Sequence, residues 1–477
     1  MADVLDLVAR LAAFDAQRAV RQATHRQVAV QPHAIVICPL AMAGEDTTVH
    51  ALAIGGIGLP AEIYVAGDPR DRDEQYDLIG WLGVRIEAYF NSCRMQGDFP
   101  QIWVSSGAAA GHLDILADRL RFTRDNPPIK RVGELLTYAT ERMPVAGQQA
   151  LMTATGALAT MFTTGQHSGD DEHLGVFLTW LSPPPGQSLQ LAIAEAESKV
   201  MGVKTDPEFD RKDLQPLVKL YNDARDRPPA ERQFRRQQIT DILTPIAEQI
   251  YDGVQLAIRY LNGQPLPDAP VLKELRREEA QAFIYFMSRR DLDKPLPYRD
   301  SPRSGAFRIV EREHALQSMM ADQPHGDAMA AARARWTGRL ISGVVVEAGS
   351  QREGRKTVHR IVIETDQVNL HVRPRDQIAW ISDPRLKMAV EDVRLAPTGS
   401  RLHVRIKAGH QSVGVPVIGT QMEVGAPPAE WGWMLRKRSD MRDRLAVMPW
   451  THGDAPIPIA VPLAAPPNLA ALVEALR

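Results

Sequence analysis

Cysteine is nearly absent from this chain of 477 residues. Its two cysteines, Cys38 and Cys93, lie far apart, with no Cys-x-x-Cys pair and no Cys/His spacing typical of a zinc site. The sequence therefore argues against a disulfide framework and against a cysteine-based metal centre. This cysteine usage is typical of the reducing cytosol, and we expect a cytoplasmic protein.

Long apolar runs and an excess of either charge are also missing. No segment approaches 18 uncharged apolar residues, so no membrane span is predicted, and the acids within residues 1–22 argue against a signal peptide. The 56 basic and 58 acidic residues leave a net charge of −2, so no global field attracts nucleic acid or an anionic membrane. Because 45 of the basic residues are arginines, scattered arginines are background in this chain.

Motifs for nucleotides and nucleophiles are equally scarce. Residues 56–61 match the dinucleotide fingerprint formally, but a β-favouring run at 62–65 follows where that fingerprint needs a helix. We therefore expect a hairpin turn there and no cofactor. A second glycine-rich loop at 104–111 precedes a predicted helix, and it is either a plain β–α connection or an anion site on backbone amides. It lacks the Lys-Ser/Thr of a phosphate loop, and no nucleophile elbow occurs.

The sequence does contain the composition of a globular protein, with 44% hydrophobic and 24% charged residues. Its length and patterning predict an α+β multidomain protein. We predict a small α/β unit behind an N-terminal helix (1–125), a helical domain with a long antiparallel helix hairpin (126–335), a small antiparallel β-barrel or sandwich (336–426), and a short helical tail with a Trp-rich basic helix and a Pro-rich stretch (427–477).

Hydrophobic periodicity places the elements inside these units. In the first unit we expect a helix at 3–27, strands at 33–40, 48–55 and 61–67, a helix beginning near residue 71, a strand near 100–107 and a helix beginning near His112. Helices follow at 129–142, 146–164, 170–181, 187–201, 210–226, 230–262, 269–290 and 308–336, with 230–262 and 269–290 forming the hairpin. Barrel strands are expected at 337–349, 357–366, 367–374, 376–382, 388–397 and 400–409.

The densest cluster of candidate metal ligands lies at residues 165–175. One interpretation is a metal-dependent hydrolase or nuclease, with His112 contributing from the α/β unit. The other is a helix start in which Ser168 is the N-cap and the acids occupy the first turn. We favour the helix start, and so predict neither a metal nor another cofactor. The candidate ligands are His167, Asp170, Asp171 and His173.

The strand predicted at 400–409 has a basic outer face. Leu402, Val404 and Ile406 alternate with basic side chains, and successive side chains of a strand point to opposite sides. We therefore expect three apolar groups in the core and a basic row in solvent. The members of that row are Arg401, His403, Arg405 and Lys407.

A second run repeats this arrangement at residues 368–373. Asn369, His371 and Arg373 are expected to face outward there, and Arg375 follows them. Residues 333–425 hold 15 basic and 9 acidic residues, although the whole chain is slightly acidic. A basic sheet face suits a phosphate backbone, whereas the alternative is an ordinary solvated strand in an arginine-rich chain. Only Trp380 lies inside the strands, which favours backbone contact over base stacking.

Two further features concern partners. The order of elements over 210–425, a helical stalk followed by a small β-barrel, resembles the accessory module inserted in some nucleic-acid helicases. That resemblance implies a module working beside a motor supplied by another chain. Near the carboxyl end, Trp431, Trp433 and Arg436 form either a docking helix for a protein partner or a cap on the barrel's open end.

These observations favour a cytosolic, non-enzymatic binding or scaffold protein over an enzyme. Its β-barrel is expected to contact the nucleic-acid backbone, or a nucleic-acid-processing partner such as a helicase or nuclease subunit, and no membrane. The alternatives are a metal-dependent hydrolase or nuclease acting through the cluster at 165–175, and a purely structural subunit of a complex.

Overall fold

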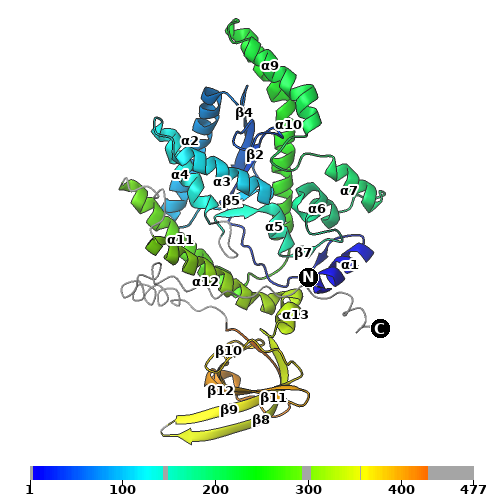
Figure 1. The fold of residues 1–477 in the computed structure, drawn as a ribbon, viewed down its shortest axis with the longest axis vertical. Helices are drawn as coiled ribbons and strands as arrows, with labels where there is room; N and C mark the ends of the chain where they lie inside the picture. Colours follow the sequence, from blue (N-terminus) through cyan, green and yellow to red (C-terminus); the bar gives the residue numbers. More distant parts are fainter. Residues whose placement is uncertain (1–3, 143–148, 293–301, 355, 428–477) are drawn as a thin grey trace, which may run out of the picture.

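The computed structural model describes residues 4–142, 149–292, 302–354 and 356–427 of the chain. It confirms the predicted α+β class, with a small mixed sheet inside a largely helical body and a closed antiparallel barrel. The barrel lies at one end of an elongated molecule, and helix α9 (Gln215–Asp223) lies at the other end (Figure 1).

The body is built on a five-stranded sheet with the order β4-β3-β2-β5-β6. Strands β2, β3 and β4 form an antiparallel meander, and β5 and β6 extend the sheet in parallel with β2. In chain order the five strands span Ile35–Leu40, Ala51–Gly56, Glu62–Val65, Ile102–Val104 and Leu151–Thr153. The three strands predicted before residue 70 are thus confirmed, whereas β6 falls inside a predicted helix.

Helices cover both faces of this sheet. Ile37 of β2 packs in one core with several helices, and its neighbours Val36 and Cys38 pack in a second core on the other side. Such burial on both faces explains why β2 is apolar throughout. The first side is covered by α2 (Arg72–Gln96), α3 (Gly107–Arg121) and α4 (Pro127–Thr140), and the second by α10 (Pro229–Asn262). Each core contains residues from before and after residue 126.

The glycine-rich stretch at 56–61 is the predicted hairpin turn. Strands β3 and β4 pair antiparallel on either side of it, and Gly58 adopts a positive φ of 74°, which glycine tolerates without a steric penalty. Helix α10 holds the turn: the Gln255 amide donates to the Gly56 carbonyl at 2.9 Å and accepts from the Gly58 N–H at 3.0 Å. The glycines therefore form a turn clamped by a helix.

The remaining elements of the body are short, except for the long helices α11 and α12. They are α1 (Val4–Asp15), β1 (Val20–Arg21), α5 (Ala154–Ala159), β7 (Phe162–Thr163), η1 (Asp170–Glu172), α6 (Leu174–Leu181), α7 (Leu189–Glu197), α8 (Pro207–Phe209), η2 (Asp210–Leu214), α11 (Pro270–Asp291), α12 (Pro302–Gly326) and α13 (Ala328–Trp336). The helix predicted at 3–27 is wrong beyond Asp15, because the chain turns there to pair β1 with β7. The helix predicted at 146–164 is wrong because this segment supplies β6, α5 and β7.

The predicted hairpin between 230–262 and 269–290 is also wrong. Helix α10 packs on β2, β3 and β4 and against α9, whereas α11 packs against α12 and α2. The two long helices diverge from their connection (Figure 1). Burial of apolar residues such as Val254 and Ile258 against the sheet explains why α10 lies on the sheet and not beside α11.

The barrel closes in the order β10-β11-β12-β9-β8-β13. Its elements are β8 (Ile341–Glu353), β9 (Lys356–Thr365), β10 (Gln377–Trp380), β11 (Lys387–Ala396), β12 (Gly399–Ala408), α14 (His410–Val413) and β13 (Gln421–Gly425). A separate apolar core fills it. The strand predicted at 367–374 is wrong, because β13 pairs with both β8 and β10 and occupies the position that this run would need. The sequence prediction had no strand at β13.

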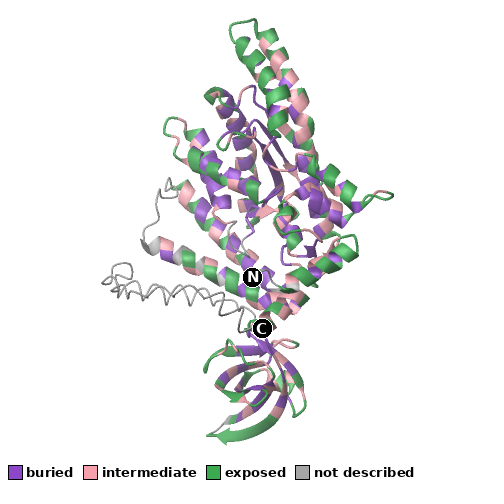
Figure 2. Cartoon of the chain, turned by 45° about the vertical axis from the view of Figure 1, so that its right-hand side comes forward, coloured by how far each residue is buried: buried purple, intermediate pink, exposed green. Residues whose placement is uncertain are grey.

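Helix α13 joins the body to the barrel (Figures 1 and 2). Arg335 near its end forms an ion pair with Glu423 of β13 at 2.6 Å. The Gln367 side-chain amide donates to the carbonyls of Arg335 and Leu340, at 2.7 and 3.0 Å. The chain that follows β9 is thereby fixed against the end of α13.

Candidate functional site

The predicted alternation on β12 is present. Leu402, Val404 and Ile406 lie in the barrel core. On the other side Arg401 and Lys407 are exposed, and His403 and Arg405 are half-buried. The side chains of the expected basic row therefore do point away from the core.

Carboxylates of β8 and β9 pair with two of the four side chains of that row. Arg401 pairs with Glu364, its partner in the β12–β9 register, at 2.6 Å. Arg405 lies 3.3 Å from Glu353. Arg360 bridges Glu353 and Glu391, at 2.7 and 2.8 Å. We call this set of six side chains the barrel lattice: Glu353, Arg360, Glu364, Glu391, Arg401 and Arg405.

The lattice changes the electrostatics of the face. The hydrogen bond from Arg360, together with the charges of Arg405 and Lys407, lowers the pKa of Glu353 below its ordinary value. The carboxylate therefore stays ionised at neutral pH and offsets the positive charges around it. Arginines held in such pairs are poorly available to an external phosphate, because binding has to break an existing pair.

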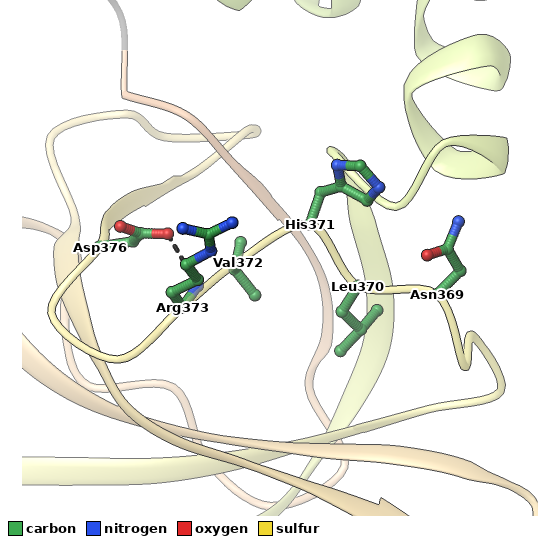
Figure 3. Close-up of a pocket in the computed structure, with 6 residues that line it drawn as sticks. All are labelled: Asn369, Leu370, His371, Val372, Arg373 and Asp376. Carbon is green, nitrogen blue, oxygen red and sulfur yellow. Dashed lines mark hydrogen bonds between the residues drawn. The ribbon is translucent and has the colours of Figure 1, made fainter. Parts of the chain in front are cut away.

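The second predicted run, residues 369–373, has the expected facing without forming a strand. Leu370 and Val372 pack against the barrel core, and Asn369, His371 and Arg373 are exposed on the opposite side (Figure 3). This segment borders a cavity of about 470 Å³, whose lining residues are Asn369, Leu370, His371, Val372, Arg373 and Asp376.

Backbone contacts hold this segment against the end of α13. The His371 N–H donates to the Gly338 carbonyl at 2.9 Å. Gly338 has a φ of 70°, and a Cβ at this position would lie 1.6 Å from the Asn369 carbonyl oxygen. Only glycine permits such a close approach. The segment is thus fixed in place although it makes no ladder with another strand.

The far end of the segment forms a tight turn. The Asp376 carboxylate accepts the Arg373 N–H at 2.7 Å, and the Arg375 N–H donates to the Val390 carbonyl at 2.8 Å. Arg375 has a φ of 83°, a conformation that side-chain-bearing residues rarely adopt. The turn displays two exposed arginines within three residues.

Arg373 and Arg375 differ from the arginines of the barrel lattice. Neither guanidinium lies within ion-pair distance of a carboxylate among the residues that the structure describes. Their charge is therefore available to an incoming anion. We call residues 369–375 the basic segment.

Sequence reasoning missed an aromatic side chain beside the basic segment. Trp336, the last residue of α13, is 85% exposed. Its neighbours Arg335 and Gly338 each accept a hydrogen bond from the 367–371 stretch. Large exposed aromatic groups are the usual stacking surface for unpaired bases. In the sequence, Trp336 is recognisable only as a tryptophan at the end of a predicted helix, whereas stacking aromatics were expected inside the strands.

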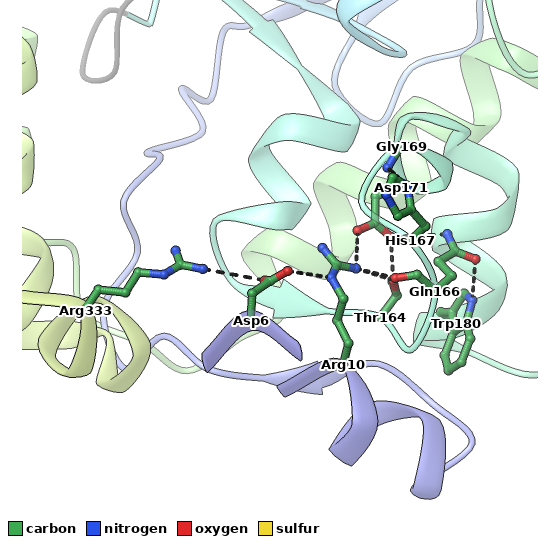
Figure 4. A network of polar contacts seen from close by, with 9 residues as sticks. All are labelled: Asp6, Arg10, Thr164, Gln166, His167, Gly169, Asp171, Trp180 and Arg333. Atoms are coloured by element: carbon green, nitrogen blue, oxygen red, sulfur yellow. Dashed lines mark hydrogen bonds and ion pairs between the residues drawn. The ribbon is translucent and has the colours of Figure 1, made fainter. Parts of the chain in front are cut away.

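The residues of the cluster at 165–175 make contacts that stabilise the fold. Asp171 lies 2.9 Å from Arg10 of α1 and also accepts from the side chains of Thr164 and Gln166 (Figure 4). Within the same cluster, Nδ1 of His167 accepts the Gly169 N–H, and Nδ1 of His173 caps α6 at the Val176 N–H. The predicted helix start is thus displaced to Leu174, with His173 in place of Ser168 as the cap.

No metal-binding arrangement follows from this cluster. Within the described ranges, no three His, Cys, Asp or Glu side chains are grouped so that they could hold an ion. His112 is separate from the cluster: its Nε2 lies 3.1 Å from the Thr48 carbonyl, and burial lowers its pKa. The structure therefore does not bring His112, His167, Asp170 and His173 together as ligands.

The helix that begins in the glycine-rich loop at 104–111 already has a carboxylate of the same chain at its N-terminus. Helix α3 begins at Gly107, earlier than the predicted start near His112, and the Gly107 N–H donates to the Glu172 carboxylate at 3.1 Å. Thr155 donates to the same oxygen at 3.4 Å. A carboxylate at a helix N-terminus is favoured by the helix dipole. The chain's own Glu172 thus occupies the position proposed for an external anion.

Comparisons with known proteins found no match. No family model matches the chain, and neither a curated protein nor a solved structure is significantly similar to it. Across the residues that the structure describes, none of the helices is long and apolar enough to cross a bilayer. The predicted partner residues Trp431, Trp433 and Arg436 lie outside the described residues.

Proposed function

We propose that this protein binds nucleic acid and that the basic segment of its barrel contacts the sugar–phosphate backbone. The observation that carries the proposal is a pair of exposed arginines, Arg373 and Arg375, which have no ion-pair partner among the residues that the structure describes. Arg373 also lines the cavity of about 470 Å³. A guanidinium presents a planar fork of donors that matches phosphate oxygens. The predicted basic surface comprised both the β12 face and the run at 369–375, and the proposal narrows it to the basic segment.

The neighbours of these arginines suit the same ligand. Asn369 and His371 face the same side as Arg373 and provide hydrogen-bond donors beside the charge (Figure 3). Trp336 adds an exposed ring on which an unpaired base can stack. Cationic and aromatic groups together favour a single strand over a duplex, because a duplex keeps its bases stacked internally.

The proposal is tested by fluorescence anisotropy with labelled single-stranded and duplex oligonucleotides at 50 and 200 mM salt. The test variant is Arg373→Glu with Arg375→Glu in the full chain. The matched control is Arg211→Glu with Arg227→Glu, two exposed arginines near α9 at the far end of the molecule. Both variants change the net charge by the same amount, so they separate a local site from a global field.

We expect the wild-type chain to bind the single strand with an affinity that falls as salt rises. The Arg373/Arg375 variant should lose affinity by about tenfold or more, since two phosphate contacts are replaced by repulsion. The control variant should stay within about twofold of wild type, as its charges lie far from the site. Absence of binding at 50 mM salt, or an equal loss in both variants, contradicts the proposal.

A further inference from the structure

Helix α1 turns its large apolar side chains toward solvent. Leu7 and Leu11 are 54% and 53% exposed, and three further apolar residues of the helix are similarly exposed. The full set is Val4, Leu7, Val8, Leu11 and Phe14, whose spacing of three and four residues places them on one face. We call this set the α1 face.

The opposite side of α1 holds the helix on the body. Ala9 and Ala13 are buried there, and their small side chains allow close packing. Asp6 and Arg10 lie on the same side, where Arg10 pairs with Asp171 and Asp6 lies 3.6 Å from Arg333 of α13 (Figure 4). The helix is therefore anchored by its polar residues and exposes its leucines, the reverse of an ordinary surface helix. These contacts prevent α1 from rotating to bury the apolar side.

The last ten residues of the chain, 468–477, have a pattern that matches this face. Two prolines precede Asn468, and this order is typical of a helix start. Leu469, Leu472, Val473 and Leu476 then recur at the same three- and four-residue spacing. A helix with this pattern carries one apolar stripe about as long as the α1 face.

The position of the last described residue makes this contact reachable. The described chain ends at Pro427, just after β13, and Glu423 of β13 is paired with Arg335 of α13. Arg333 of the same helix lies beside Asp6 of α1. Helix α13 is only about 13 Å long, and a chain of 40 residues, the length of 428–467, extends about 60 Å even when it is wholly helical. The intervening chain is thus long enough to bring 468–477 to the α1 face.

We propose that residues 468–477 form an amphipathic helix that covers the α1 face of the same chain. The proposal is independent of nucleic-acid binding. Residues 468–477 would shield an apolar surface from water and would link this segment to α1.

Disulfide trapping in the full chain tests this contact. The variant Leu11→Cys with Leu472→Cys places one thiol at the centre of each stripe, and the control Leu11→Cys with Glu474→Cys places the second thiol on the far side of the same predicted helix. The native Cys38 and Cys93 are buried and do not compete. After mild oxidation, non-reducing electrophoresis and peptide mass mapping measure the fraction of each disulfide and whether it lies within one chain.

We expect the Leu11/Leu472 pair to form an intrachain disulfide about tenfold faster than the control pair, at a rate independent of protein concentration. Equal rates for the two pairs overturn the proposal. So does a disulfide that forms between chains, since this outcome assigns the α1 face to a second copy.

Truncation provides an independent readout. Removing residues 468–477 should increase the fluorescence of 8-anilinonaphthalene-1-sulfonate several-fold, and adding Leu7→Ser with Leu11→Ser to the truncated chain should abolish the increase. Unchanged fluorescence after truncation means that something other than this segment, or nothing, covers the α1 face. That result also overturns the proposal.

Discussion

At the scale of single residues, the availability of an arginine depends on its surroundings and not on its sequence pattern. Arg401 and Arg405 occupy the outward positions of a regular strand, yet carboxylates of β9 and β8 lie 2.6 and 3.3 Å from them. Arg373 and Arg375 lie in an irregular segment, where no described carboxylate pairs with their side chains. Charge that is already paired contributes little to binding a further anion.

A second residue-scale feature is the buried imidazole of His50, which precedes β3. Only 1% of this side chain is exposed, and burial lowers its pKa to about 4. In the unfolded chain the same group titrates near 6.5. The folded state therefore requires neutral His50, and its stability is reduced wherever the unfolded state binds the extra proton.

The pKa difference predicts acid sensitivity. The contribution of His50 is complete above pH 6.5 and is lost as the pH falls toward 4. Between pH 7.5 and 4.5 the free energy of unfolding should fall by about 2 to 3 kcal/mol more in the wild-type chain than in His50→Leu, which cannot take up a proton. Urea denaturation at several pH values measures this difference. Parallel pH profiles for the two chains contradict the assignment.

At the scale of elements, the barrel shows what local patterning can and cannot predict. The period-two runs at β8, β9, β11 and β12 are long and apolar on one side. The bounds of β9, β11 and β12 were predicted to within one residue, whereas β8 begins and ends four residues later than predicted. The run at 367–374 has the same alternation, and its outward and inward residues were predicted correctly even though it is no strand. Alternation in the sequence indicates which side of a segment is buried. Strand pairing depends instead on which other segments lie nearby in the folded chain.

The misplaced helices have a similar physical cause. Residues 151–153 and 20–21 form strands because β5 and β7 offer them hydrogen-bonding edges that only the folded chain brings near. The predicted hairpin of α10 and α11 is wrong because the apolar residues of α10 are buried against the sheet. The pairing of Arg360 with Glu391 was equally hidden, because the two residues are 31 positions apart and lie on β9 and β11, which β12 separates in the closed barrel.

The barrel lattice leads to a prediction of its own. Glu353→Gln removes the carboxylate shared by Arg360 and Arg405, which frees positive charge on the face of β12. Affinity for a single strand at 50 mM salt should therefore rise by about threefold or more, and its salt dependence should steepen. Anisotropy titrations measure both quantities.

The matched control is Glu347→Gln on the same strand. Glu347 is exposed, and no described residue forms an ion pair with it. Both variants add one unit of net charge, but only Glu353→Gln releases arginines. Identical gains in the two variants would show that net charge, and not the lattice, controls binding.

At the scale of the whole molecule, the body and the barrel are distinct units linked by α13. The barrel has its own apolar core, and the basic segment lies where it meets the end of α13 (Figures 1 and 3). Helix α13 also contacts α1 through Arg333 and Asp6. If the proposed binding is correct, a ligand at the basic segment would lie beside the end of α13, which connects the two units within the described part of the chain.

The most direct test of the central claim is to map where a single strand lies on the intact protein. A 4-thiothymidine-containing oligonucleotide is photo-crosslinked to the full chain at 50 mM salt, and the modified peptides are identified by mass spectrometry. We expect crosslinks concentrated in the peptides that carry residues 369–375 and Trp336. Crosslinks confined to the β12 face or to the helical body, with none at the basic segment, would contradict it.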